Sequence, residues 1–276
     1  MEVRENIMSK TIKIVIGFIL GALYLVPIVM LLSAAFKTQK NIFKDIFGFP
    51  DPIVWTNFGE AMERMEYSRA LFNSLFFTII STILIVFFAS MAAWVLVRYK
   101  TKMSSFIFTL FAVSMLIPFQ CVMLPMMSIM GKLKILNVGG LVFAYIGFGS
   151  ALSIMLFHGF IKGIPIELEE SAMLDGCTMF GVYRQIVLPL LGPIVTTVGI
   201  LNIMWIWNDY LLPSLVIGSD MKWRTLPLKT FYFFGQFSSR WDYAAAALIL
   251  SMLPIVTFYI IAQKKIIKGV VDGAVK

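Results

Sequence analysis

The sequence predicts an all-α integral membrane protein with six transmembrane helices and a short cytoplasmic helix between the fourth and the fifth. Hydrophobic residues make up 59% of the 276 residues and charged residues only 14%, and the mean hydropathy is +0.88. Soluble domains carry about a quarter charged residues, so the lipid bilayer is the main solvent of this chain. A polar, acid-rich stretch at residues 164–189 interrupts the apolar pattern.

Six stretches are long and apolar enough to cross a bilayer, which requires about 20 residues each. They are residues 12–36, 71–97, 106–130, 141–161, 186–217 and 243–263, which we place in one predicted domain over residues 1–276. The first follows a basic N-terminus, as a secretory signal would. Its apolar run at residues 14–35 exceeds the roughly 7–15 residues of a signal peptide, so we predict that it is retained as a span.

Prolines predict where these helices bend. Pro27, Pro118, Pro125 and Pro254 lie within predicted spans, and a proline in a helix interior removes a backbone hydrogen bond and kinks the helix. The fifth stretch is long and carries prolines near both ends. Neighbouring helices can satisfy the carbonyls that such prolines free in a membrane, so none of them excludes a span.

Basic residues predict the orientation in the membrane. Six spans place both termini on one side, and lysines and arginines in short loops set which side is cytoplasmic. Residues 98–102 and 264–268 are dense in basic residues, whereas the longer loops at 37–69 and 218–242 mix both signs. We therefore predict a multi-pass cell-membrane protein with both termini, and residues 164–189, in the cytoplasm.

The composition excludes several classes of function. The net charge of +8 follows membrane topology and forms no basic stripe with interleaved aromatics, so we expect no nucleic-acid partner. Cys121 and Cys177 fit no metal-ligand spacing and His158 is the single histidine, so we expect no metal site. The sequence lacks a GxxxxGK[ST] phosphate loop. We therefore expect no cofactor on this chain, and no catalytic residues.

Residues 164–189 read as two short helices joined by a turn. Pro165 ends the fourth span, and the glutamate-rich stretch 167–170 follows in a first helical turn, where the helix dipole favours anions. Gly176 is predicted to end this helix and Thr178 to cap the next. We expect the carboxylates to be ionised and water-facing. Composition alone leaves open a solvated amphipathic helix without a partner.

This stretch resembles the EAA loop of bacterial ABC-importer permeases, and we call it the EAA segment. Residues 170–172, Gly176, Ile186 and 188–189 match the family spacing E-A-A-x3-G-x9-I-x-L-P, with Ser171 in place of the second alanine. The resemblance covers nearly the whole chain. Within the family, the chain is similar to the carbohydrate-uptake, MalG-like subfamily. The residues that carry the subfamily resemblance are 117–120, 164–170, 207–210 and 273–276.

The resemblance implies a transmembrane permease subunit of an ATP-driven ABC importer for sugars or oligosaccharides. It implies a second, homologous permease, two cytoplasmic ATPase subunits that hold ATP and Mg²⁺, and an extracytoplasmic sugar-binding protein as partners. The first short helix would be a coupling helix that docks on the ATPase and links its closure to alternating access. The residues implied in coupling are Glu167, Glu170, Ser171, Ala172, Asp175, Gly176, Leu188 and Pro189.

A sugar path through the membrane requires hydrogen-bonding side chains and aromatic platforms. Asp209 is the one carboxylate deep in an apolar run, and such carboxylates are functional by default. A packing or interface role for Asp209 is equally compatible with the sequence. The candidate path residues are Gln120, Tyr145, Asn202, Trp205, Asn208 and Asp209.

Three alternatives stay open. An importer of another solute, such as a polyamine or glycerol phosphate, shares the architecture, although a polyamine path should contain several intramembrane acids. An intramembrane enzyme would require a nucleophile–base pair or two facing aspartates, which the sequence does not offer. A self-contained secondary transporter would have inverted repeats and more spans, and it would leave the EAA segment unexplained.

Overall fold

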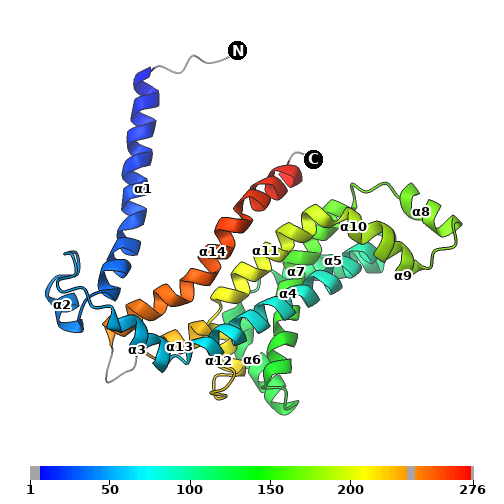
Figure 1. Ribbon diagram of the computed structural model, residues 1–276. Helices are drawn as coiled ribbons and strands as arrows, with labels where there is room; N and C mark the ends of the chain where they lie inside the picture. The colour runs from blue at the N-terminus through cyan, green and yellow to red at the C-terminus, as the bar shows by residue number, and fades with distance from the viewer. Residues whose placement is uncertain (1–6, 235–239, 275–276) are drawn as a thin grey trace. The chain divides into compact units, whose positions relative to one another are not determined.

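Helices joined by turns and short irregular segments make up the part of the chain that the structure, a computed structural model, describes (Figure 1). The described residues are 7–234 and 240–274, and side chains are described for 10–234 and 240–263. This confirms the predicted all-α class. The elements are α1 (Ile7–Ala35), α2 (Gln39–Lys44), α3 (Thr56–Arg64), α4 (Tyr67–Arg98), α5 (Lys102–Ser114), α6 (Phe119–Lys132), α7 (Val138–Ile161), α8 (Glu167–Leu174), α9 (Met179–Val182), the π-helical turn η1 (Tyr183–Val187), α10 (Leu188–Leu190), α11 (Gly192–Asn208), α12 (Leu211–Val216), α13 (Leu226–Phe231) and α14 (Trp241–Ala274).

Four helices within the described residues, α1, α4, α7 and α14, are long and apolar enough to cross a membrane. Two bent pairs raise the number to six if each pair counts as one span: α5 with α6, and Met179–Leu190 with α11. The predicted spans 71–97, 141–161 and 243–263 lie within α4, α7 and α14, and the predicted span 12–36 ends one residue beyond α1.

The predicted third span, residues 106–130, consists of two helices. α5 and α6 meet at an angle of 107°. Pro118 precedes α6 with extended backbone angles, φ −65° and ψ 141°. A proline ring fixes φ, removes the N–H donor and disfavours helical geometry in the residue before it, so α5 does not continue through this point. The predicted interruption at Pro118 is confirmed, whereas Pro125 lies inside α6 and does not end it.

The structure differs from the sequence prediction over residues 186–217, which do not form one helix. Met179–Leu190 and α11 meet at 79°, next to Gly192 and Pro193. α11 then ends at Asn208, because Asp209 takes an extended conformation with φ −74° and ψ 125°. The continuous apolar pattern therefore conceals two changes of direction.

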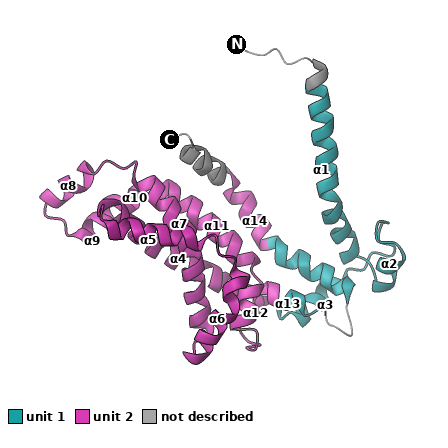
Figure 2. Cartoon of the chain, turned by 180° about the vertical axis from the view of Figure 1, so that it is seen from behind, with its two compact units in different colours: residues 1–67, 229–253 teal, residues 68–228, 254–276 magenta. Residues whose placement is uncertain are grey.

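The chain divides into two compact units by its internal contacts (Figure 2). Unit 1 comprises residues 1–67 and 229–253. Within it, buried Asn57 donates hydrogen bonds to two backbone carbonyls at the end of α1, and the Lys229 Nζ and Glu66 Oε1 atoms lie 2.7 Å apart. The apolar side chains along the described part of α1 are largely exposed, as expected for a lipid-facing helix.

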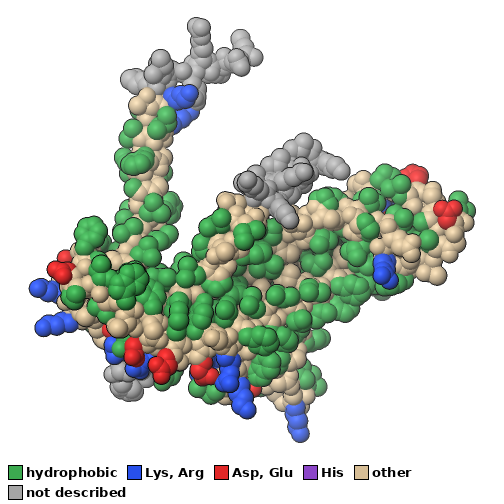
Figure 3. Space-filling model, viewed as in Figure 1, with side chains coloured by type: hydrophobic (Ala, Val, Ile, Leu, Met, Phe, Trp, Pro, Cys, Tyr) green, Lys and Arg blue, Asp and Glu red, His purple; other side chains and the backbone are tan. Residues whose placement is uncertain are grey.

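Unit 2 comprises residues 68–228 and 254–276. Its central helix, α7, packs against α5, α11 and α12. α8 and α9 lie together at one end of this unit, away from α12 (Figure 1). In Figure 3, hydrophobic side chains cover the visible faces of the long helices, whereas charged side chains gather near their ends. This distribution is expected for helices that face lipid.

Candidate functional site

α8 ends in a Schellman turn at Gly176. The Gly176 N–H donates to the Met173 carbonyl and the Cys177 N–H donates to the Ala172 carbonyl, each at 3.0 Å. These two bonds satisfy carbonyls that the helix end leaves unpaired. Gly176 has a φ of +87°, and a Cβ added there would meet nothing within 4 Å. The left-handed backbone, not crowding, therefore requires glycine, and the predicted end of the helix is confirmed.

The second short helix is longer than predicted. Thr178 caps it through a hydrogen bond from the backbone N–H three residues later, at 3.2 Å, which confirms the predicted cap. α9 continues without a break into η1, where the Leu188 N–H bonds the Tyr183 carbonyl. The next residue, Pro189, has no N–H to donate. A π-helical turn suits this position, because its shifted hydrogen-bond pattern accommodates a backbone carbonyl to which Pro189 cannot donate.

Glu169 joins α8 to the end of α4 through a buried ion pair. Glu169 is only 3% exposed. Its Oε1 accepts hydrogen bonds from Arg98 Nη2 at 2.7 Å and Nε at 2.9 Å, and its Oε2 accepts one from Trp94 Nε1 at 2.9 Å. The expectation that this carboxylate faces water was wrong. Three donors, two of them charged, replace the water that burial removes.

The remaining acidic residues of α8 lie on its exposed side. Glu167 and Glu170 are exposed, as is Asp175 directly after the helix. Leu174 is 89% exposed, an extreme value for leucine. The surface of α8 thus offers an apolar side chain next to carboxylates.

The other implied coupling residues have structural contacts within the chain itself. The Ser171 hydroxyl donates to the Glu167 carbonyl at 2.8 Å. Ala172 is 7% exposed and belongs to the hydrophobic core beneath α8, where Leu188 also packs. The resemblance implied a role in coupling for Ala172. In the structure it is the chain's own core that leaves little room there.

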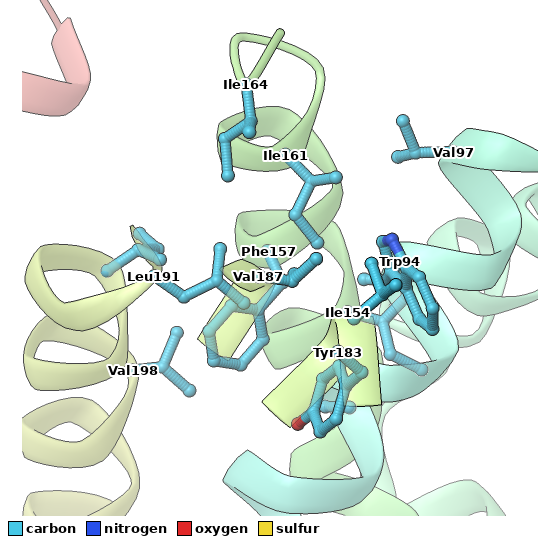
Figure 4. Close-up of a cluster of buried hydrophobic side chains, with 14 of the residues drawn as sticks. Trp94, Val97, Ile154, Phe157, Ile161, Ile164, Tyr183, Val187, Leu191 and Val198 are labelled. Carbon is cyan, nitrogen blue, oxygen red and sulfur yellow. The ribbon is translucent and has the colours of Figure 1, made fainter. Parts of the chain in front are cut away.

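This core connects α4, α7, η1 and α11 beneath the EAA segment (Figure 4). Tyr183 is 1% exposed, and its hydroxyl lies 2.7 Å from the Ser90 hydroxyl of α4. Its ring centroid lies 5.7 Å from that of Trp94. The Trp94 side chain therefore contacts both the core and the Glu169 carboxylate, which ties α8 to the packing of unit 2.

Three candidate path residues lie together in unit 2. The Tyr145 hydroxyl lies near the Asp209 carboxylate, and the rings of Tyr145 and Trp205 meet edge-to-face with centroids 5.6 Å apart. Asp209 Oδ1 also accepts from the Leu211 N–H at 3.0 Å, which starts α12. Asp209 therefore has a structural contact and also an aromatic neighbourhood of the kind a sugar site requires.

The other three path candidates have separate contacts or are exposed. Asn202 is buried and donates to the Ser153 hydroxyl at 3.0 Å, which packs α11 against α7. Asn208 is exposed, and its amide donates to the Met204 carbonyl of its own helix at 2.7 Å. Gln120 is exposed at the start of α6. In this conformation Asn202 serves helix packing.

Residues suited to metal binding are dispersed in the described part of the chain. No group of three or more His, Cys, Asp or Glu side chains there could hold a metal ion. Cys121 and Cys177 are free thiols. His158 is buried and stacked on Phe108, with ring centroids 3.9 Å apart. Packing accounts for this histidine.

Comparison with known proteins identifies the family. Residues 85–272 match the family described as "Binding-protein-dependent transport system inner membrane component". The chain belongs to this family. It is thus an inner-membrane transporter component of binding-protein-dependent systems and not an enzyme, and the EAA segment and α8, as its coupling helix, fit the family. The resemblance drawn from the sequence is confirmed.

Relatives of the permease cover its whole length. It is 43% identical over 99% of both chains to a probable starch degradation products transport system permease protein of Thermoanaerobacterium thermosulfurigenes. It is 31% identical to a multiple sugar-binding transport system permease protein of Streptococcus mutans, with 100% of this chain and 99% of the relative covered. It is 32% identical to a melibiose/raffinose/stachyose import permease protein of Bacillus subtilis, with 97% and 98% covered.

A solved structure shares the fold of the permease. A bacterial ABC transporter involved in the import of the acidic polysaccharide alginate contains a chain that matches with a TM-score of 0.78. The match covers 96% of this chain and 98% of that chain at 19% sequence identity. This agreement supports the all-α membrane fold.

Proposed function

We propose that this chain is one permease subunit of an ATP-driven importer of sugars or oligosaccharides, in which α8 couples ATPase closure to alternating access. The observation that carries the proposal is the buried contact of Glu169 with Arg98 and Trp94, which ties an otherwise exposed acidic helix to α4. A helix without a partner would need no such attachment. The relatives named for starch products, multiple sugars and raffinose-type sugars support the substrate class.

The exposed side of α8 is the proposed docking surface for the ATPase. Leu174 would enter an apolar depression, and Glu167 and Glu170 would face basic groups of the ATPase. Force on α8 would pass through Glu169 to α4, and through the core around Tyr183 to α7 and α11. Docking shifts the permease between states only if the contacts differ between the open and the closed ATPase.

The proposed assembly contains a second, homologous permease, two cytoplasmic ATPase subunits and an extracytoplasmic sugar-binding protein. ATP and Mg²⁺ would bind to the ATPase subunits, because this chain has no phosphate loop. Both termini and α8 would be cytoplasmic. The basic residues Arg98, Lys100 and Lys162, which surround one cavity near α8, support this orientation.

The proposed sugar contacts centre on Tyr145, Trp205 and Asp209. Trp205 is 40% exposed and offers an aromatic face, while Asp209 offers a carboxylate near the Tyr145 hydroxyl. Exposed Gln120 and Asn208 would extend the path. Sugar hydroxyls could replace the local hydrogen bonds of these side chains one for one.

Charge reversal at Glu170 tests the docking role. Glu170→Lys changes an exposed residue and leaves the buried contacts of α8 in place. We expect recovery of the ATPase with a tagged permease to fall about tenfold or more, because like charges across an interface cost several kcal/mol. Glu63→Lys, which reverses another exposed glutamate in α3, is the matched control. Equal recovery of the ATPase from both variants contradicts docking through Glu170.

Uptake by the complete system tests the substrate class. We expect cells that carry the system as their single importer of this type to take up labelled starch-derived or raffinose-type oligosaccharides. Uptake of a labelled polyamine or glycerol phosphate, with no saccharide taken up, would assign the permease to another solute. ATPase recovery in the same cells separates a wrong substrate class from a wrong coupling role.

A further inference from the structure

A cavity of about 660 Å³ lies where α4 ends, α5 begins and α7 ends, all within unit 2. Ligand pockets in proteins have volumes of about 300–1,000 Å³, so this one is large enough for a small ligand or a headgroup. The residues that line it are Leu96, Val97, Arg98, Lys100, Thr101, Ser104, Ser105, Phe108, His158 and Lys162.

The lining of the cavity is cationic. Arg98 ends α4 and Lys100 follows in the next turn, whereas Lys162 follows α7. No acidic residue lines the cavity in the part of the chain that the structure describes. Arg98 pairs with Glu169, which leaves the two lysines. Neither lysine forms an ion pair with a described residue. Two ammonium groups gathered without a counter-charge repel each other, so an anion would stabilise this arrangement.

The cavity lining contains both polar and apolar side chains. Thr101, Ser104 and Ser105 supply hydroxyl groups beside the basic residues in the lining, and Leu96 and Phe108 supply apolar surface. A free inorganic anion would gain nothing from the apolar wall. An amphipathic molecule with a charged group and a hydrocarbon part would contact both.

α5 leads from this cavity along an exposed apolar face. Met103, Phe106 and Leu110 are 64%, 58% and 52% exposed, and their spacing of three and four residues places them on one side of the helix. Acyl chains of a lipid whose headgroup occupies the cavity would lie along this side. The charge, the mixed walls and the adjoining apolar face thus point to the same class of ligand.

We propose that this cavity binds the phosphate-bearing headgroup of an anionic phospholipid, with Lys100 and Lys162 as its charge partners. Basic pockets between transmembrane helices on the cytoplasmic side are suited to such headgroups. The assignment of the headgroup to the cytoplasmic leaflet rests on the proposed orientation of the permease. The existence of the cavity and its positive charges does not depend on that orientation. The bound headgroup would brace α4, α5 and α7 beside the Arg98–Glu169 pair that holds α8.

The test uses the complete transporter complex, purified and exchanged into nanodiscs of defined composition. Native mass spectrometry and lipid extraction would measure retention of phosphatidylglycerol against phosphatidylcholine. We expect K100Q/K162Q to bind phosphatidylglycerol about thirtyfold more weakly, since each lysine near an anionic surface contributes about fivefold to affinity. K132Q/K134Q removes the same charge from two exposed lysines at the end of α6 and should change nothing.

Equal retention of the two lipids by the unmodified complex, or unchanged retention by K100Q/K162Q, would overturn the proposal. Inorganic phosphate, added as a competitor, distinguishes the source of the anion. Displacement of phosphatidylglycerol by millimolar phosphate, with phosphate itself bound, would assign the cavity to a soluble anion and not to a lipid. Recovery of the ATPase is measured in each sample, so that failure of the lipid proposal is distinguished from failure of the proposed function. Lipid selectivity can fail while the ATPase still assembles with the permease.

Discussion

The region around α8 and the region around Asp209 satisfy their polar groups in different ways. At α8, Glu169 bonds side chains of α4 that lie up to 75 residues away in the sequence. Around Asp209, much of the bonding is local. Asp209 accepts from the Leu211 N–H, and Asn208 donates to the Met204 carbonyl of its own helix. Tertiary contacts hold the first region, and short-range contacts dominate the second.

This difference matches two separate mechanical requirements. A buried ion pair is costly to break, because removal of one partner leaves an uncompensated charge. A hydrogen bond near an exposed surface is replaced by another donor or acceptor at little net cost. The region around α8 is therefore suited to keep one geometry while it transmits force. The region around Tyr145, Trp205 and Asp209 is suited to exchange its partners as a substrate passes.

The largest expected effect comes from Glu169→Ala, which removes the attachment of α8 to α4. Arg98 would keep its hydrogen bond to the Ile164 carbonyl but lose its counter-charge. Breaking a buried pair in this way costs about 3–5 kcal/mol. We expect a lower melting temperature of the purified permease complex and loss of uptake. Thermal unfolding monitored by fluorescence, together with an uptake assay, measures both.

Two controls isolate the ion pair from the other contacts of Glu169. Trp94→Phe removes one hydrogen bond to the carboxylate, which is worth about 1.5–3 kcal/mol, so its effect should be smaller. Glu167→Ala removes an exposed carboxylate from the same helix and should leave the melting temperature nearly unchanged. Equal melting temperatures for Glu169→Ala and Glu167→Ala would remove the proposed contrast between the two regions.

Local signals in the sequence predicted the backbone of the EAA segment. Gly176 ends α8 and Thr178 caps the next helix, because caps depend on a few neighbouring residues. The pairing of Glu169 with Arg98 was missed. Three glutamates in the first turn look alike in sequence, and only the packing of α8 against α4 decides which one is buried.

Hydropathy predicted the number of spans better than their course. It cannot register the 79° bend before α11 or the 107° bend at Pro118, because a bent pair of helices has the same composition as a straight one. Residue chemistry likewise marked Asn202 as a path residue. Its partner, Ser153, lies 49 residues away on α7, and that contact exists only in the folded chain.

A second variant tests whether the region around α8 depends on its fixed backbone. Gly176→Val places a β-branched residue at a φ of +87°, and the left-handed region costs L-residues about 1–2 kcal/mol. We expect uptake to be lost while the subunit still inserts in the membrane. Membrane fractionation and ATPase recovery would be measured on the same cells.

Gly176→Asn sharpens this test, because asparagine enters the left-handed region more readily than valine. We expect it to retain more uptake than Gly176→Val. Gly192→Val is the control for added bulk. Gly192 has equally open surroundings but no positive φ, and the substitution places a β-branched residue near the start of a helix. A loss of uptake that is the same for valine and asparagine at 176 would mean that side-chain bulk at a docking surface, and not backbone strain, is decisive.

The smallest expected effect on stability comes from Asp209→Asn, which probes the other region. Asparagine keeps a carbonyl oxygen that can accept from the Leu211 N–H, so the start of α12 should persist. The negative charge near the Tyr145 hydroxyl would be lost. We expect an unchanged melting temperature and a raised KM for uptake, because a charge-assisted bond to a substrate hydroxyl becomes a neutral one.

Asp220→Asn is the matched control for this last variant. Asp220 Oδ1 accepts from the Lys222 N–H at 3.0 Å in an exposed turn, so it has the same kind of local contact as Asp209 outside the proposed sugar path. Normal uptake by both variants would leave Asp209 with the capping contact alone. A raised KM confined to Asp209→Asn, with stability intact, would separate a group that exchanges partners from a group such as Glu169, whose loss must lower stability and uptake together.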